Sequence, residues 1–405
     1  MNEAPGRASS AIRSPLGFAS VLALASGTST VTLFAVSALS PYIVSDLGIN
    51  RAQLGFLTIG CYGIAAITAP RFGKMVDRID SRRAILFMFL VVSLGVALMS
   101  VAPNYWLVMA AGTIPGIALG LANPATNRML ATNAPVHRQG LYMGIKSSGG
   151  QLAAMGVGIT LPVLGANFGW RWAMISVSSL GVAGFFASRF FLPRDKPSKK
   201  PVQKKQKINS FRWVLIHGFC TSIALGPIVL YLPLYTYERL DASPVVAGMT
   251  TAIFGGVSVV ARLAWGSLAD RRMAIRKVLF IVSILSSVFS LTIALAEYSE
   301  FWILWIGVVG FGATAGAWVT LAMVGLIRMV KFDQIGHASG LLQFVGIVGF
   351  LMGPILFGLL VEAVDSYTGG LIVAAALFCL AGIIAFPRGA QRRLVEIGDE
   401  MTVVE

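Results

Sequence analysis

The chain alternates between long apolar stretches and short polar segments along nearly its whole length. Each apolar stretch is long enough, at roughly 20 residues, for an α-helix to cross the hydrocarbon core of a bilayer. We count about twelve such stretches by this criterion, at residues 18–40, 52–70, 84–102, 106–131, 140–164, 172–192, 213–235, 244–265, 277–297, 301–327, 337–360 and 369–387. The pattern therefore predicts an all-α polytopic membrane protein with about twelve transmembrane helices.

Composition supports this class. Hydrophobic residues make up 56% of the 405 positions and charged residues 12%, against about a quarter charged in soluble domains. Cys61, Cys220 and Cys379 all fall inside predicted spans, which indicates neither a disulfide framework nor a metal site. No clustered catalytic groups or phosphate-binding glycine loop is apparent, so we expect no enzymatic activity, cofactor or metal.

The distribution of charge predicts an orientation. If the N-terminus is inside, the outer loops hold only Arg51, Arg171 and Arg239 of the 32 Lys and Arg. By the positive-inside rule, both termini lie in the cytoplasm, including the tails 1–17 and 388–405. The net charge of +15 then indicates contact with anionic lipid rather than nucleic acid. We expect a monomer in the cytoplasmic membrane, whose first span is retained rather than cleaved.

One polar stretch divides the chain near its middle. Residues 193–212 carry eight Lys and Arg, a composition typical of a solvated, disordered linker. The linker separates a six-helix bundle at 18–192 from a second at 213–387.

The two bundles share a charged motif. "GKMVDRIDSRR", Gly73 to Arg83, is matched by "GSLADRRMAIRK", Gly266 to Lys277, at a constant shift of 193 residues. A charged motif repeated in register indicates an internal duplication. The matched pairs are Gly73 and Gly266, Asp77 and Asp270, Arg78 and Arg271, and Arg83 and Arg276. A shift of 196 residues pairs Gly140 with Gly336 and Gly144 with Gly340.

Two six-helix halves with this loop resemble the major facilitator superfamily. Its signature between helices 2 and 3 runs Gly, three residues, Asp-Arg, one residue, Gly, then basic residues; here Asp80 replaces the second Gly. The resemblance covers nearly the whole chain. It implies transport by rocking of two halves around a site near the membrane middle. The gating motif would then comprise Gly73, Asp77, Arg78, Arg82 and Arg83, with Gly266, Asp270 and Arg271 as its second copy.

The charges of the motif suit a cytoplasmic latch. We expect Gly73 to end helix 2 and Asp77 to meet the positive end of a neighbouring helix. The resemblance implies that this neighbour is the helix that starts near Gly336 and His337. Asp270 would do the same for the helix that starts near Gly140. Arg78, Arg82 and Arg83 are expected at headgroup level, paired with Asp77, Asp80 or lipid. The alternative is that these charges only set orientation.

Arg128, Lys146 and Arg262 are cations inside predicted spans, and no Asp or Glu falls mid-span. None of the three is duplicated, and ionisable groups within a membrane are functional candidates. They predict an anionic substrate, with Arg262 forking onto a carboxylate. "ARLAWG", Ala261 to Gly266, resembles the monocarboxylate and oxalate/formate branches, although Ser258 stands where the former carry Asp. Alternatively, Arg262 snorkels to the surface and Arg128 pairs with an inner loop.

Other polar residues could complete the site. Asn123, Asn127, Gln343, Tyr62 and Tyr231 lie in predicted pore-lining helices, where interhelical hydrogen bonding is the alternative. His217 and His337 begin helices 7 and 11; they are candidates for proton coupling, or are simply interfacial.

We therefore predict secondary transport of a small organic anion, by proton symport or exchange. The alternative is proton-coupled efflux of drugs or metabolites. The resemblance makes efflux less favoured, because the efflux branches usually carry Gly-Pro in helix 5, which 140–164 lacks, and commonly bury a carboxylate.

Overall fold

The computed structural model describes residues 14–76, 79–135, 138–194, 211–270, 275–330 and 335–387. Within these ranges, twelve helical segments are long and apolar enough to cross a membrane. This confirms the predicted fold class. In chain order the helices are α1 Pro15–Ala38, α2 Ser40–Leu47, α3 Arg51–Thr58, η1 Ile59–Gly63, α4 Ile64–Val76, α5 Ser81–Val101, α6 Tyr105–Ala111, α7 Thr113–Asn133, α8 Gln139–Phe168, α9 Trp170–Phe191, α10 Arg212–Arg239, α11 Pro244–Asp270, α12 Ile275–Leu295, η4 Ala296–Tyr298, α13 Trp302–Thr314, η5 Ala315–Ala317, α14 Trp318–Met329, α15 Ile335–Val364 and α16 Tyr367–Ala385.

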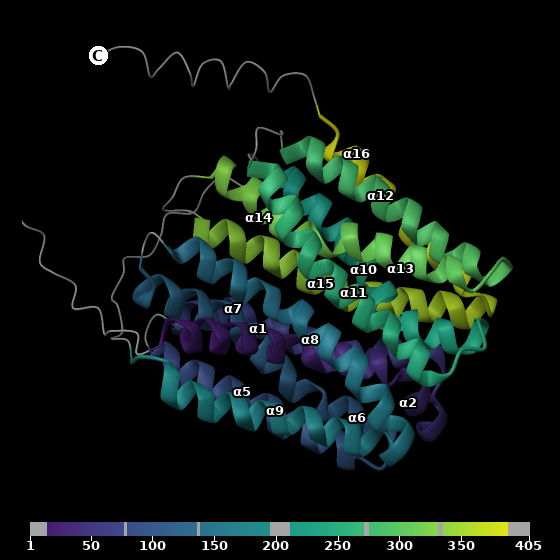
Figure 1. Ribbon diagram of the computed structural model, residues 1–405, viewed down its shortest axis with the longest axis horizontal. Coiled ribbons are helices and arrows are strands. Elements are labelled where there is room, and N and C mark those ends of the chain that lie inside the picture. The colour runs from purple at the N-terminus through teal and green to yellow at the C-terminus, as the bar shows by residue number, and fades with distance from the viewer. Residues whose placement is uncertain are drawn as a thin grey trace, which may run out of the picture.

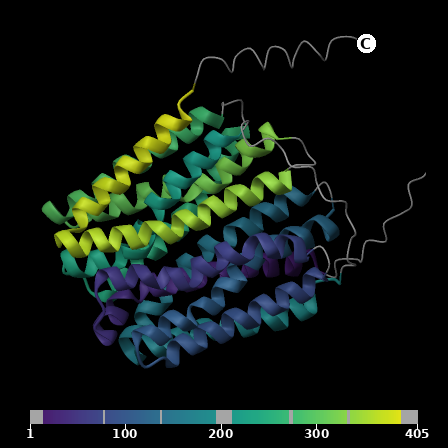
Figure 2. The ribbon, with the colours of Figure 1, turned by 180° about the vertical axis from the view of Figure 1, so that it is seen from behind.

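The helices form two groups that lie side by side (Figures 1 and 2). The N-terminal group is α1–α9, drawn purple to teal, and the C-terminal group is α10–α16, drawn green to yellow. We call the end of the molecule with residues 79–80 and 138 the inner end, after the predicted orientation. The opposite end, with Gly48, Asn104 and Gly169, is the outer end.

Local sequence fixes several helix ends. The Asp80 side chain caps α5 by accepting a hydrogen bond of 3.0 Å from the backbone N–H of Arg82. Asn50 and Gln53 form a reciprocal capping box at the start of α3. Gly169 separates α8 from α9 with φ of 84°, a conformation that glycine adopts without steric cost.

Two spans contain irregular turns. The span α3–η1–α4 includes a π-helical turn at Ile59–Gly63, a feature frequent at functional sites. The span α13–η5–α14 includes a 3₁₀ turn at Ala315–Ala317. One prediction is wrong here: Gly73 does not end its helix, since α4 continues to Val76. By contrast, α8 and α15 begin at Gln139 and Ile335, close to the expected starts.

The two groups meet chiefly along two seams, one between α3 and α15 and the other between α8 and α11, and α1 also contacts α10 and α11. Small residues allow close approach in both. A Cβ added to Gly55 would lie 2.5 Å from the Pro354 carbonyl oxygen, and one on Gly158 would lie 2.3 Å from the Ala252 nitrogen. Such close backbone contact is typical of helix packing in membranes, where small residues are enriched at interfaces.

Candidate functional site

Lys146 lies on α8 with only 3% of its surface exposed. Its Nζ donates a hydrogen bond of 2.9 Å to Oδ1 of Asn123 and another to Oδ1 of Asn127. The two asparagines are one turn apart on α7, so their side chains share a face. Because a buried ammonium is costly without hydrogen bonds, these amide oxygens stabilise it while leaving its charge unneutralised.

Arg262 lies half-buried on α11 and reaches both groups of helices. Its Nε donates to the carbonyl of Gly316 in η5 at 2.9 Å, and its Nη1 donates to the carbonyl of Ser147 in α8 at 2.7 Å. Ser147 directly follows Lys146. Arg262 therefore places a guanidinium from the C-terminal group beside the α8 segment that carries the buried ammonium.

The structure thus brings four predicted residues to one region, namely Lys146, Asn123, Asn127 and Arg262. In the part of the chain that the structure describes, the recorded acceptors of Lys146 and Arg262 are amide and carbonyl oxygens rather than carboxylates. Two cations whose partners among the described residues are all neutral form a region that can attract a negatively charged group.

Arg128 lies apart from these residues. Its Nη1 donates to the carbonyl of Ile79 at 3.0 Å, in the segment between α4 and α5 at the inner end. This contact matches the alternative that Arg128 pairs with an inner loop.

Tyr231 was predicted to offer its hydroxyl to substrate, but the structure engages that hydroxyl elsewhere. It donates to the carbonyl of Arg51, with a second contact of 3.3 Å to the carbonyl of Pro354. These partners belong to the two groups of helices at the outer end. Tyr231 therefore joins the groups instead of facing the Lys146 region. Gln343 lies half-buried on α15.

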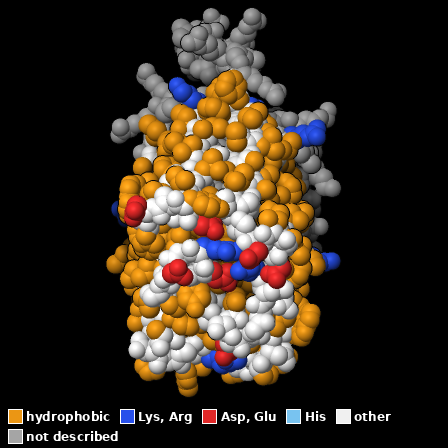
Figure 3. All heavy atoms as spheres, turned by 90° about the vertical axis from the view of Figure 1, so that its right-hand side faces the viewer, with side chains coloured by type: hydrophobic (Ala, Val, Ile, Leu, Met, Phe, Trp, Pro, Cys, Tyr) orange, Lys and Arg blue, Asp and Glu red, His pale blue; other side chains and the backbone are white. Residues whose placement is uncertain are grey.

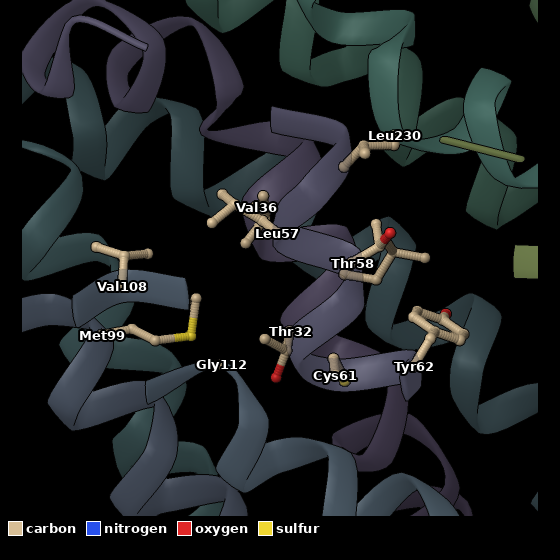
Figure 4. Close-up of a pocket in the computed structure, with 11 residues that line it drawn as sticks. Thr32, Val36, Leu57, Thr58, Cys61, Tyr62, Met99, Val108, Gly112 and Leu230 are labelled. Carbon is tan, nitrogen blue, oxygen red and sulfur yellow. The ribbon is translucent and has the colours of Figure 1, made fainter. Parts of the chain in front are cut away.

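Tyr62 lies in the π-helical turn and contacts the opposite group. Its ring stacks on Phe350 of α15, with centroids 5.6 Å apart and planes at 11°. Tyr62 also lines a cavity together with Thr32, Thr58 and Cys61 (Figure 4). The cavity measures about 20 Å³, which is room for about one water molecule, so it is too small to be a substrate site.

Sequence reasoning missed two contributors to this region and one buried polar residue on the same helix as Lys146. The carbonyls of Ser147 and Gly316 that hold Arg262 are backbone groups, which no residue type reveals. Gln151 follows Lys146 on α8 and is 8% exposed, and its Oε1 accepts no hydrogen bond within the described ranges. A buried polar side chain in an apolar span was the available signal for Gln151.

Of the two candidate histidines, the structure describes the side chain of His217. His217 is fully buried inside the C-terminal group, and its Nε2 lies 3.0 Å from Oγ of Ser283. His217 does not begin its helix as expected, because α10 begins five residues earlier at Arg212. The side chain of His337 lies outside the described residues.

The charged motif is described in part. Arg82 is only 9% exposed, and its Nη2 donates to the carbonyl of Arg189 at the end of α9. This contact places a positive charge at a helix C-terminus, where it is stabilising. Arg83 is exposed. Within the described ranges, a Cβ on Gly266 would have no heavy atom within 4 Å, so no described element packs closely there.

The residues expected to form the latch itself lie outside the described part of the chain. These are Asp77, Arg78 and Arg271, together with the side chain of Asp270. The cytoplasmic latch stays a prediction.

A twelve-span bundle in two groups, with the buried Lys146 in one group and the half-buried Arg262 reaching that group from the other, is typical of a polytopic membrane transporter. The sequence profile described as "Major Facilitator Superfamily" matches residues 21–275 and 214–400. The chain belongs to this superfamily.

Relatives of the chain are similar along most of its length. The Inner membrane transport protein YdhP of Escherichia coli K12 is 25% identical over 366 residues, covering 88% of this chain and 89% of that protein. The Multidrug resistance protein MdtG of Yersinia enterocolitica is 24% identical over 384 residues, covering 88% and 90%. The Nitrite extrusion protein of Bacillus subtilis 168 is 25% identical over 367 residues, covering 85% and 88%.

Solved structures share the fold. A D-xylose-proton symporter matches with a TM-score of 0.76 at 14% identity, over 92% of this chain and 96% of that one. A bacterial homolog of the human lysosomal transporter Spinster, in an inward-facing and unoccupied conformation, matches with a TM-score of 0.75 at 13% identity, over 91% and 95%.

Proposed function

We propose that this chain is a secondary transporter of a small organic anion, in which Lys146 and Arg262 bind the negative charge. The observation that carries the proposal is the approach of Arg262, by its 2.7 Å bond to Ser147, to the residue next to Lys146. The two cations come from opposite groups of helices. If an anion bound between them, Lys146 and Arg262 would donate to its charged oxygens in place of neutral ones. Charged acceptors form stronger hydrogen bonds.

The contacts of Arg262 also suggest how binding and movement are connected. Its Nη1 holds a carbonyl of the N-terminal group, while its Nε holds one of its own group. A carboxylate that takes over Nη1 would release the bond to Ser147. We therefore propose that bundles 18–192 and 213–387 rock as bodies around this region, by proton symport or anion exchange, with both termini in the cytoplasm and the chain acting as a monomer.

A relative's name supports an anionic substrate class. The Bacillus subtilis protein is called a Nitrite extrusion protein, and nitrite is a small anion. The word "extrusion" in that name makes export as compatible with the proposal as import. The alternative, efflux of drugs or metabolites, is favoured by the name of the Yersinia relative, a Multidrug resistance protein.

Uptake into liposomes tests the proposal. The purified chain is assayed with labelled monocarboxylates, dicarboxylates and nitrite, with and without a pH gradient. Removing one charged hydrogen-bond partner should weaken anion binding by about ten- to a hundredfold. We expect that loss for Arg262→Gln and for Lys146→Gln, measured as a raised KM.

Arg189→Gln is the matched control, since this arginine is exposed at the inner end of α9. It should transport like the unmodified chain. Transport of a cationic dye without any anion would overturn the anion proposal in favour of efflux. Equal anion uptake by Arg262→Gln and the unmodified chain would remove Arg262 from the site.

A further inference from the structure

We propose that Arg51 is the latch that holds the outer end of the molecule closed, so that transport requires its release. Here the outer latch means Arg51 together with its partners Tyr231, Glu238, Glu362 and Asp365. The inference rests on the superfamily's alternating openings, and not on the substrate being an anion.

Arg51 is the first residue of α3, and its recorded polar contacts reach the C-terminal group. Its Nε lies 2.8 Å from Oε2 of Glu238, and its Nη1 lies 2.7 Å from Oδ1 of Asp365. Its backbone N–H donates to Oε2 of Glu362 at 3.2 Å, and its carbonyl accepts from the hydroxyl of Tyr231. One residue of the N-terminal group therefore joins α10, α15 and the turn between α15 and α16 through side chain and backbone alike.

The surface that receives Arg51 is rich in carboxylates, visible near the middle of the outer end in Figure 3. Arg239 of the same group lies 2.9 Å from Asp365 and 4.0 Å from Glu297. Without Arg51, the described part of this surface would hold four carboxylates, of Glu238, Glu297, Glu362 and Asp365, beside Arg239. Their mutual repulsion would rise when the outer end opens, so the positive charge of Arg51 favours the closed state.

Burial strengthens this effect. The side chains of Arg51 and Glu238 are 24% and 20% exposed, so water and salt screen the pair less than they screen a surface ion pair. Gly358 allows the approach, because a Cβ there would lie 2.8 Å from the Arg51 carbonyl oxygen and 2.2 Å from the Tyr231 hydroxyl.

The latch is not duplicated in the second half of the chain. The shift of 193 residues places Pro244, the first residue of α11, opposite Arg51. The α8–α11 seam is joined by close packing, for example where a Cβ on Gly248 would lie 2.0 Å from Pro162, and by the bond from Arg262 to the neutral carbonyl of Ser147. In the described part of the chain, the ion pairs that join the two groups are those of Arg51. Ion pairing at this seam alone points to a task in the cycle rather than in the shared scaffold.

Labelling of a buried cysteine tests the latch without any substrate. Ser37 is fully buried, and its hydroxyl donates to the carbonyl of Val229 in the opposite group at 2.6 Å. Ser37→Cys is made in a chain whose three natural cysteines are replaced by Ala. A membrane-impermeant maleimide is then added to intact cells from the outside. Opening of the outer end should expose this cysteine.

We expect Arg51→Gln to raise the labelling rate roughly tenfold, the population shift that about 1.4 kcal/mol produces. Arg51→Glu should raise it further, since it adds a fifth carboxylate to the cluster. Arg51→Lys should give an intermediate rate, because one ammonium cannot reproduce the two ion pairs of the guanidinium. Because Arg51→Lys keeps the positive charge, its labelling rate tests the latch if Arg51→Gln does not fold.

Arg171→Gln is the control. Arg171 is also an outer arginine with an ion pair, but its partner Asp46 belongs to the same group of helices. The indole N–H of Trp170 and the Arg171 guanidinium hold the pKa of Asp46 below its usual range. Labelling should be unchanged in Arg171→Gln. An equal rise in this control, or a rate in Arg51→Gln and Arg51→Lys equal to that of the unmodified chain, would overturn the latch.

Discussion

At the scale of single residues, the buried ammonium of Lys146 depends on neutral partners. Its Nζ is held by the amide oxygens of Asn123 and Asn127. The two asparagines are four residues apart on one helix, so the sequence predicts that they share a face. That Lys146 on another helix meets this face could not be foreseen, because the sequence does not state how α7 and α8 are rotated against each other.

Asn127→Leu should lower the free energy of unfolding by about 1–3 kcal/mol, since it leaves a donor of a buried charged group unpaired. The thermal unfolding midpoint in detergent measures the loss. Asn167→Leu is the control on the exposed outer part of α8 and should leave the midpoint unchanged.

A second substitution separates the charge from the packing. Adding Lys146→Met to Asn127→Leu should recover part of the lost stability, because apolar replacement of both partners can be nearly neutral. A double variant as unstable as the sum of the single ones would show that Asn127 contributes through shape alone.

At the scale of elements, apolar length predicted the twelve spans but not the irregularities inside them. The π-helical turn at Ile59–Gly63 and the 3₁₀ turn at Ala315–Ala317 have no distinct residue pattern, since both read as continuous apolar helix. They are decided by contacts with neighbouring helices. Through these turns Tyr62 meets Phe350, and Gly316 presents its carbonyl to Arg262.

The glycines of α8 provide an element-scale test within one helix. A Cβ on Gly149 would lie 1.9 Å from the Ala23 carbonyl oxygen of α1, whereas one on Gly156 would have no heavy atom within 4 Å. Gly149→Ala should therefore force α1 and α8 apart and destabilise the protein by about 1–3 kcal/mol.

Gly156→Ala is the matched control and should be neutral or raise stability by up to about 1 kcal/mol, because alanine favours helix more than glycine does. Thermal unfolding of both variants in detergent gives the comparison. Equal midpoints for the two would contradict the close packing of α1 on α8.

At the scale of the whole molecule, charge distribution predicts the direction in which the bundle lies in the membrane. Basic residues concentrate in the segments of the inner end and in both tails. By the positive-inside rule, a green fluorescent protein fused after residue 405 should fluoresce, and alkaline phosphatase fused there should be inactive. Phosphatase inserted near Asn104, at the outer end, is the control and should be active. Active phosphatase at the C-terminus would reverse the orientation, and with it the side from which Arg51 is reached.

The sequence by itself determined the membrane class, the twelve spans and the cations that have no counterpart in the other half. These follow from local properties, namely apolar length, charge and repetition. The tertiary structure alone decided which side chains meet: Lys146 with two asparagines, Arg262 with a carbonyl of the opposite group, and Arg51 with Glu238 and Asp365. The physical reason is that apolar spans of similar composition carry little information on their rotation and neighbours. Those are set by close backbone packing at small residues and by polar groups that find partners away from water.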